Sequence, residues 1–102
     1  MIGAPNYAPA SQAMYEILRT SQFKRDVKLA QKRGKDTDGL RTVIETLAQG
    51  QTLPAEYRDH QLKGVFKDCR ECHIEGDWLL IYRIEGNVLQ IVRTGTHSDL
   101  FR

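Results

Sequence analysis

The sequence is short of several residue types, and each scarcity limits what the protein can be. Its 102 residues include two cysteines, one tryptophan and three prolines. Two cysteines are too few for a disulfide framework of the kind that stabilises small secreted proteins. No apolar run approaches the roughly 18 residues of a membrane-spanning helix, and the N-terminus lacks the basic and apolar regions of a signal peptide. We therefore expect a cytoplasmic protein without a membrane partner.

A charge imbalance is also missing, because the formal net charge is only +2. The distribution of charge says more than its sum, since the basic residues cluster in one segment that is opposed only by Asp26. They are Lys24, Arg25, Lys28, Lys32, Arg33 and Lys35. A basic stripe of this kind is typical of a nucleic-acid contact and equally typical of a solvated helix face. The stripe alone leaves both interpretations open.

The length and composition predict one domain with a short extension. A chain of 102 residues fits a single domain, and its apolar fraction of 40% is ordinary for a globular protein. Residues 1–13 are small, uncharged and proline-containing, which indicates a leader or a flexible extension. We therefore assign the folded domain to residues 14–102.

The first half of this domain reads as a strand followed by two helices. Residues 15–19 favour a strand, and Ser21 is a plausible N-cap for a helix over residues 21–33. A second helix is predicted from about residue 38 to residue 50. Its apolar positions follow the helical period most clearly, at Leu40, Val43, Ile44 and Leu47. A short charged connection joins the two helices into a hairpin.

The second half reads as a loop followed by strands. Residues 51–61 are predicted to form the loop, and strands are predicted over residues 65–74, 78–84 and 88–94. The run over 78–84 is almost continuously apolar, as in a central strand covered on both faces. Short turns between the strands favour antiparallel pairing, and the C-terminus suggests a tight turn with a single helical turn. This order indicates an α+β fold, with the helical hairpin packed on a mainly antiparallel sheet.

A Cys-x-x-Cys-His string, Cys69 to His73, matches the attachment signature of c-type haem. Its context does not support haem. Both methionines, Met1 and Met14, precede the string, so none follows to serve as the usual second axial ligand. In a strand, Cys69 and Cys72 would also point to opposite faces. We therefore favour two structural thiols.

All three histidines, His60, His73 and His97, lie in the last third of the chain together with Asp77. Three imidazoles could hold zinc and leave a position open for water, but spacings of 13 and 24 residues match no compact metal motif. The other possibility is acid–base chemistry without a metal. RNA cleavage suits such groups, because the nucleophile is the substrate's own 2′-hydroxyl. The spacing alone leaves these possibilities open, beside ordinary structural roles.

Two further residue types would serve RNA cleavage. Arginines stabilise the charge that develops on the phosphorane. Arg83 and Arg93 lie at the ends of adjacent predicted strands, and simple alternation places each on the same side of its strand as every second apolar residue. An aromatic ring would stack on a base, and Phe101 lies close to His97 in sequence. Phe101 could equally close the core.

Four motifs together resemble one family. They are FKRDVKLAQKR over residues 23–33, LPxxYxDHxLxG over 53–64, HIEGDWLLIY over 73–82 and RTGTHSDLF over 93–101. Residues 14–102 resemble in these motifs the YafQ-type toxins of the RelE/ParE superfamily, which belong to type II toxin–antitoxin systems. The resemblance implies a RelE-like, microbial RNase-like fold. It also implies a ribosome-dependent endoribonuclease that cuts mRNA in the decoding site and inhibits translation, with no metal or other cofactor.

The resemblance also assigns roles to residues. The catalytic positions of the family fall on His60, His73, Asp77, His97 and Phe101. His97 resembles the general acid, His60 or Asp77 the base, and Phe101 the residue that orients the substrate. Arg93 resembles the arginine that stabilises the phosphate, whereas Arg83 is a candidate RNA contact from its strand position alone.

Partners are implied in the same way. The basic residues Lys24, Arg25, Lys28 and Lys32 become contacts to ribosomal RNA, beside the mRNA substrate itself. A small DinJ- or RelB-like antitoxin is expected to cover the site. The alternative is a RelE-like module that only binds RNA or protein. The complete set of histidines favours the enzyme, since a module that only binds would not need both an acid and a base.

Overall fold

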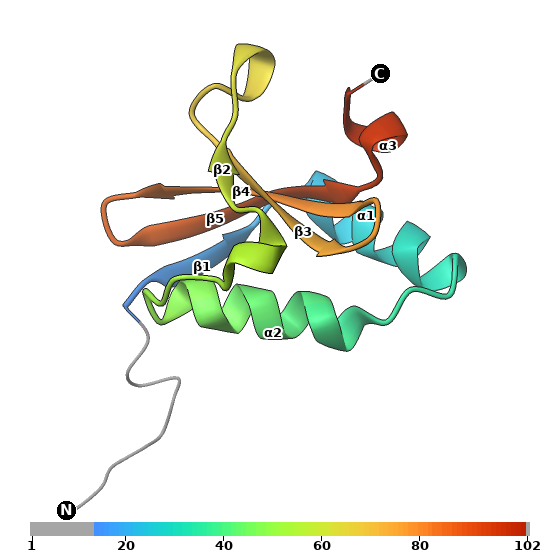
Figure 1. Ribbon diagram of the computed structural model, residues 1–102, viewed down its shortest axis with the longest axis horizontal. Helices are drawn as coiled ribbons and strands as arrows, with labels where there is room; N and C mark the ends of the chain where they lie inside the picture. The colour runs from blue at the N-terminus through green and yellow to red at the C-terminus, as the bar shows by residue number, and fades with distance from the viewer. Residues whose placement is uncertain (1–13, 102) are drawn as a thin grey trace, which may run out of the picture.

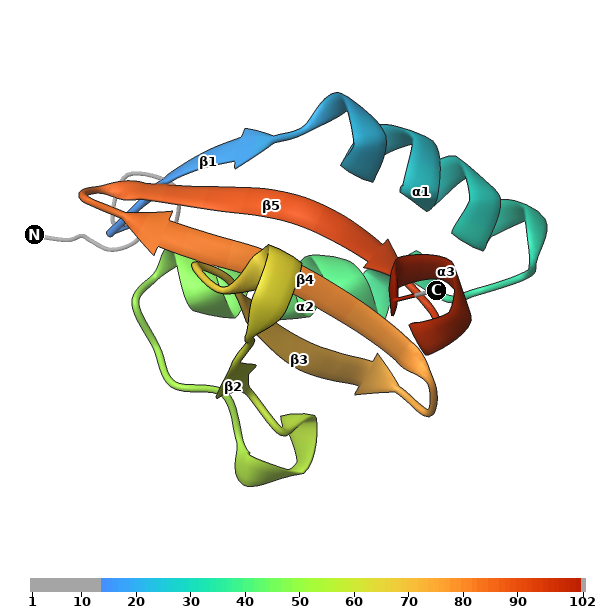
Figure 2. The same ribbon diagram turned by 90° about the horizontal axis from the view of Figure 1, so that it is seen from above.

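The structure, a computed structural model, describes residues 14–101 (Figures 1 and 2). The extension predicted over residues 1–13 lies outside the described residues. Ten elements follow one another along the chain: β1 (Glu16–Arg19), α1 (Ser21–Lys32), α2 (Thr37–Ala48), the 3-10 helix η2 (Ala55–Tyr57), β2 (His60–Gln61), the 3-10 helix η3 (Gly64–Phe66), β3 (Arg70–Glu75), β4 (Trp78–Glu85), β5 (Val88–Gly95) and α3 (His97–Phe101). Within this part of the chain no helix is long and apolar enough to cross a bilayer.

The strands form one five-stranded sheet in the order β1-β5-β4-β3-β2. β1 pairs in parallel with β5, and the other pairings are antiparallel. α2 runs beneath the sheet in Figure 1, and Figure 2 shows α1 along the edge where β1 and β5 lie. The predicted α+β fold, with helices on a mainly antiparallel sheet, is confirmed.

The central strand β4 buries both of its faces, as its apolar run predicted. Trp78, Leu80 and Tyr82 point toward the helices and join a large core cluster. That cluster includes the four apolar residues of α2 that the helical period identified, namely Leu40, Val43, Ile44 and Leu47. Leu79 and Ile81 point to the other side, where they form a small cluster with Cys69 and Leu100. We call this second side the open face, because α2 does not cover it.

The N-cap of the first helix lies one residue earlier than predicted. Thr20, not Ser21, caps α1, and its Oγ1 accepts a hydrogen bond from the N–H of Phe23 at 2.9 Å. The same hydroxyl donates to the carbonyl of Val92 at 2.7 Å. Thr20 therefore caps the helix and also attaches the start of the helix to β5. Local sequence preference cannot predict this attachment to β5.

The strand predicted over residues 65–74 is wrong in its first half. Residues 64–66 form η3, and the strand begins only at Arg70. The segment between β2 and β3 rises off the sheet in Figure 1 and is closed by a hydrogen bond from the N–H of Leu62 to the carbonyl of Cys69, at 2.9 Å. Leu62 and Phe66 pack on the open-face cluster, so tertiary packing overrides strand alternation here. The predicted loop over 51–61 likewise contains η2 and β2.

A bulge in β5 changes the direction of Arg93. Tyr82 pairs with Ile91 and Ile81 pairs with Arg93, so Val92 is the extra residue. Simple alternation predicted Arg93 on the same side as Ile91, and this is wrong because Ile91 faces the helices. The bulge turns Arg93 to the open face, which it shares with Arg83.

Candidate active site

The strand register collects the candidate residues on the open face. His60 pairs with Glu71, Glu71 with Ile81, and Ile81 with Arg93, so these residues form one row across β2, β3, β4 and β5. The neighbouring row runs from His73 through Leu79 to Gly95, which lies two residues before His97. Residues paired across strands point to the same face. The sheet therefore brings histidines from distant parts of the chain to one surface.

Glu71 lies between two of the histidines. Its Oε1 is 3.4 Å from Nε2 of His60 and 3.9 Å from Nε2 of His73, and its side chain is only 4% exposed. A buried carboxylate requires positive partners or hydrogen-bond donors, and the two imidazoles are positioned to supply them. Glu71 was not among the predicted site residues. The available signal was its position two residues before His73, which places both on one face of a strand.

The other nitrogens of the same two rings face backbone carbonyls. His60 Nδ1 lies 2.6 Å from the carbonyl oxygen of Arg58, and His73 Nδ1 lies 3.4 Å from that of Gly76. A carbonyl only accepts hydrogen bonds, so each Nδ1 carries the hydrogen. Each ring satisfies its carbonyl and Glu71 together only when both of its nitrogens carry hydrogen.

A second carboxylate orients the third histidine. Asp77 Oδ1 lies 2.5 Å from Nδ1 of His97 and accepts the backbone N–H of His97 at 3.2 Å. The hydrogen bond from the His97 side chain holds the pKa of Asp77 below its usual value. Asp77 is therefore ionised near neutral pH and fixes the hydrogen of His97 on Nδ1. Nε2 of His97 remains free to exchange a proton with a substrate.

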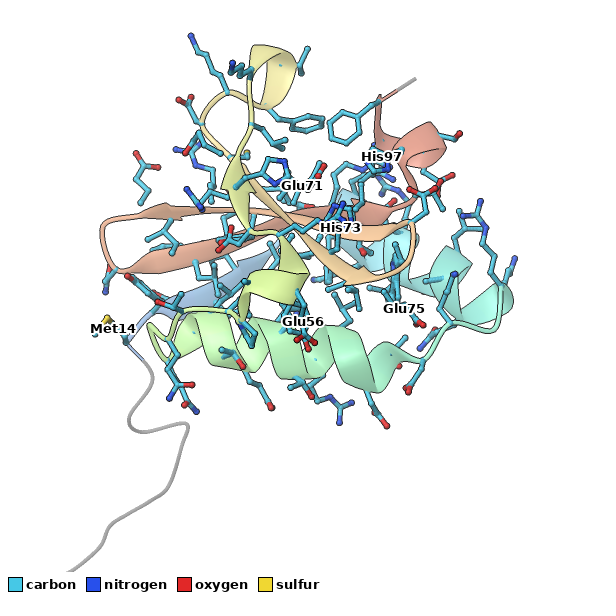
Figure 3. The ribbon with its side chains drawn as sticks, in the orientation of Figure 1. Met14, Glu56, Glu71, His73, Glu75 and His97 are labelled. Atoms are coloured by element: carbon cyan, nitrogen blue, oxygen red, sulfur yellow. The ribbon has the colours of Figure 1, made fainter. Side chains whose placement is uncertain are left out.

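Aromatic rings connect these groups in space. The ring centroids of His73 and His97 lie 6.0 Å apart, those of His97 and Phe101 5.9 Å apart, and those of Phe101 and Phe66 5.8 Å apart. Figure 3 shows Glu71, His73 and His97 above the sheet, between the segment that follows β2 and α3. Phe101 is 42% exposed, so one side of its ring is available to a base. Phe66 had no signal in the sequence.

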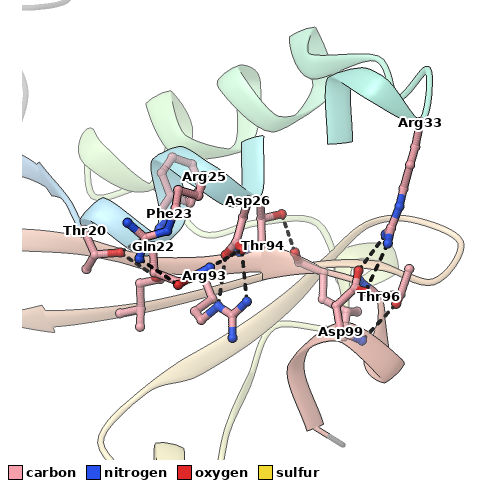
Figure 4. A network of polar contacts seen from close by, with 12 residues as sticks. Thr20, Gln22, Phe23, Arg25, Asp26, Arg33, Arg93, Thr94, Thr96 and Asp99 are labelled. Atoms are coloured by element: carbon pink, nitrogen blue, oxygen red, sulfur yellow. Dashed lines mark hydrogen bonds and ion pairs between the residues drawn. The ribbon is translucent and has the colours of Figure 1, made fainter. Parts of the chain in front are cut away.

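The two predicted arginines occupy different positions. Arg93 shares the row of Glu71, but its Nε and Nη2 each donate to Asp26 of α1 at 3.0 Å (Figure 4). Asp26 raises the pKa of Arg93 through these hydrogen bonds. Asp26 thus binds only the Nε–Nη2 edge of the guanidinium, and Nη1 does not take part in these hydrogen bonds. Arg83 lies two residues beyond Ile81 and pairs with Glu85 at 2.7 Å, away from the histidines.

The basic residues of α1 are separate from the histidines. Phe23, Asp26 and Ala30 form the buried side of this helix. The predicted RNA contacts lie on its exposed side: Lys24, Arg25, Lys28 and Lys32. The structure thus supplies a basic helix surface at the β5 edge, distinct from the group of histidines.

The cysteines belong to opposite core clusters, as the alternation of a strand predicted. Cys69 lies in the open-face cluster and Cys72 in the cluster beneath the helices. Burial raises the pKa of the Cys72 thiol to about 12, so this thiol stays protonated. Two buried thiols on opposite faces do not fit covalent attachment of one haem. Among residues 14–101, no three His, Cys, Asp or Glu side chains are grouped as metal ligands.

Comparison with known proteins identifies the family. Residues 15–102 match the family described as a bacterial toxin of type II toxin–antitoxin systems, YafQ. The chain belongs to the YafQ family. The mRNA interferase toxin YafQ of Escherichia coli K12 is 45% identical over 87 residues, which are 84% of this chain and 95% of that protein. The predicted family is confirmed.

Solved structures of YafQ-family and related toxins have the same fold. In the crystal structure of the E. coli DinJ–YafQ toxin–antitoxin complex, a chain with 43% sequence identity superposes with a TM-score of 0.81, over 87% of this chain and 99% of that one. A metal-bound toxin from Helicobacter pylori, with 44% identity, gives a TM-score of 0.80 over 86% and 100% of the two chains. The predicted RelE-like fold is therefore confirmed.

Proposed function

We propose that this chain is a ribosome-dependent endoribonuclease that cuts mRNA in the decoding site and thereby inhibits translation. Its relative with 45% identity is named an mRNA interferase, which supports the endoribonuclease activity. The observation that carries the mechanism is the Asp77–His97 pair, which leaves Nε2 of His97 free beside the rings of His73 and Phe101. Such an enzyme acts in the cytoplasm, where ribosomes translate.

His97 is the general acid in this proposal. Its Nε2–H protonates the departing 5′-oxygen, and ionised Asp77 stabilises the imidazolium that carries this proton. The exposure of His97, at 55% of its side chain, gives an RNA strand access to Nε2. Phe101 holds the neighbouring base by stacking, at a centroid distance of 5.9 Å from the His97 ring.

His60 is better suited than Asp77 to be the base. Asp77 already receives two hydrogen bonds from His97 on one oxygen, and its lowered pKa makes it a weaker base. An imidazole that takes the proton of the 2′-hydroxyl becomes a cation, and Glu71 lies 3.4 Å from His60 to stabilise that cation. The 2′-oxygen then attacks the phosphorus, the bond to the 5′-oxygen breaks, and a cyclic phosphate and a 5′-hydroxyl result.

The negative charge that develops on the phosphorane is stabilised by His73 and Arg93. His73 lies between Glu71 and the carbonyl of Gly76 and can donate a hydrogen bond to the phosphate region of the substrate, and Arg93 offers the edge of its guanidinium that Asp26 does not use. Every proton transfer is thus assigned to a side chain of this protein, and no step uses a metal or another cofactor.

Binding to the ribosome uses surfaces outside the histidine group. We assign contacts with ribosomal RNA to Lys24, Arg25, Lys28 and Lys32 on the exposed side of α1, and an outer phosphate contact to Arg83. An antitoxin of the DinJ kind is proposed as the neutralising partner, because the E. coli structure holds such a complex. The catalytic domain is proposed to span residues 14–102.

Mapping of mRNA 5′ ends after induction in a bacterial host tests this function. The wild-type chain is expected to arrest growth and to produce 5′-hydroxyl ends clustered at in-frame codons. His97→Ala removes the acid and should abolish both effects, whereas Ser98→Ala, at an exposed neighbouring position, should preserve them. A module that only binds RNA or protein would arrest growth equally well as His97→Ala, and that result would reject the enzyme.

A further inference from the structure

The helix that carries His97 and Phe101 is too short to hold itself in place. α3 has five residues, and isolated helices of that length are not stable in water. One of its attachments is Leu100, which is buried in the open-face cluster. Another is its close approach to β5, since a Cβ added at Gly95 would lie 2.9 Å from Cβ of Asp99. The position of both catalytic side chains therefore depends on tertiary contacts of α3.

An ion pair attaches α3 to the end of α1. Arg33, the C-cap residue of α1, donates from Nη1 to Oδ2 of Asp99 at 2.7 Å and from Nη2 to Oδ1 at 3.3 Å (Figure 4). Asp99 Oδ2 also accepts the N–H of Thr96 at 2.9 Å, and Oγ1 of Thr96 accepts the N–H of Asp99 at 3.1 Å. One carboxylate thus joins the first turn of α3 to the end of a different helix.

Packed side chains do not fill the space between these helices. A cavity of about 260 Å³ lies between α1, the end of β5 and α3, and both Arg33 and Asp99 line it. Within residues 14–101, the Arg33–Asp99 pair is the only hydrogen-bonded contact between α1, with its cap, and α3. α1 itself is held firmly against β5, because Asp26 of α1 binds Arg93 and the N–H of Thr94 on β5.

We propose that Arg33 and Asp99 are positioning residues, which hold α3 at the distance from α1 that places His97 and Phe101 for cleavage. This inference rests on the proposed function, because it gives the pair a role in that reaction. Neither residue touches the reacting atoms. A proton donor displaced by about 1 Å can slow a reaction as much as about a hundredfold, so a pair at the protein surface can control the rate without controlling the fold.

Single-turnover cleavage of ribosome-bound mRNA tests the proposal with Arg33→Gln, Asp99→Asn and the double variant. Asparagine keeps a side-chain carbonyl oxygen, so Asp99→Asn removes the ion pair and keeps an acceptor for the N–H of Thr96. Each single variant should lower the maximal rate roughly ten- to a hundredfold with an unchanged half-saturating ribosome concentration. The double variant should be no slower than the slower single variant, because the residues act as one unit. Arg33→Lys should recover part of the rate.

A matched control and a structural readout make the outcomes separable. Arg41→Gln removes an exposed arginine from α2 and should cleave at the wild-type rate. By NMR, the nuclear Overhauser contacts between the rings of Phe66 and Phe101 should weaken in Arg33→Gln and persist in Arg41→Gln. If wild-type protein cuts no RNA but these contacts still weaken, the proposed function fails and the positioning role stands. Wild-type rates, or unchanged ring contacts, in Arg33→Gln and Asp99→Asn would overturn the proposal.

Discussion

The two faces of the sheet are made by the same strands and differ in almost everything else. On β4, Trp78 and Leu80 face the helices and belong to a large cluster sealed by α1 and α2. Their neighbours Leu79 and Ile81 face the other way and have two other buried residues in their cluster. Both faces are fully buried at these positions, yet the histidines of the candidate site lie around the apolar floor of the open face.

This difference separates the residues that stabilise the fold from those that carry the proposed reaction. A face that a helix covers can satisfy few polar side chains, because buried polar groups need partners. The open face can hold Glu71 at 4% exposure beside His60 at 50%, so charged groups sit at the boundary between apolar floor and water. Substitutions on the helix-covered face should therefore affect folding alone, whereas substitutions on the open face should also affect cleavage.

Among substitutions that compare the two faces, the largest effect on cleavage is expected at Glu71. Glu71→Gln keeps the shape of the side chain and removes the charge that holds His60 and His73, which should slow single-turnover cleavage by about 10- to 100-fold. Glu75→Gln, at the exposed end of the same strand, is the control and should retain the wild-type rate. If Glu71→Gln also cleaves at that rate, the buried carboxylate does not organise the open face.

Two adjacent leucines compare the faces directly. Leu80→Ala, beneath the helices, should lower the free energy of unfolding by about 2–5 kcal/mol, measured by urea denaturation, and leave cleavage per folded molecule unchanged. Leu79→Ala should lower the free energy of unfolding by a similar amount and should also slow cleavage, because Leu79 lies in the row between His73 and Gly95. Equal cleavage by both folded variants would remove the distinction between the faces.

The smallest effect concerns acid stability. Arg33 holds the pKa of Asp99 below its usual value of 3.8, so the ionised carboxylate stabilises the fold above that pH. This contribution is lost as the pH falls below 3.8 toward the pKa of the folded state. Asp99→Asn should therefore be slightly less stable than wild type at pH 7, with the difference vanishing in acid.

Acid unfolding followed by circular dichroism measures this difference between Asp99→Asn and wild type. Asp68→Asn, at an exposed position in the segment before β3, serves as the control and should follow the wild-type curve. A constant gap between Asp99→Asn and wild type from pH 7 to low pH would contradict the ion pair as its cause.

Local patterns predicted much of the fold and part of the site. The period of α2 and the apolar run of β4 identified core elements, because each reflects contacts that repeat along one element. Three features depend on contacts between elements that no single element's pattern shows. The β5 bulge turns Arg93, the buried carboxylate of Glu71 depends on histidines from two strands, and Arg33 meets Asp99 across 66 positions. Each is fixed by tertiary structure.

Proton transfer by His97 is the central claim, and a chemically altered mRNA tests it most directly. Sulfur in place of the 5′-bridging oxygen at the cut site makes a leaving group that needs no proton. On ribosome-bound mRNA of this kind, His97→Ala should cleave at nearly the wild-type rate, whereas it should fail on normal mRNA. His60→Ala should stay slow on both substrates, since the base is still needed. Equal loss of activity by His97→Ala on both substrates would contradict the account.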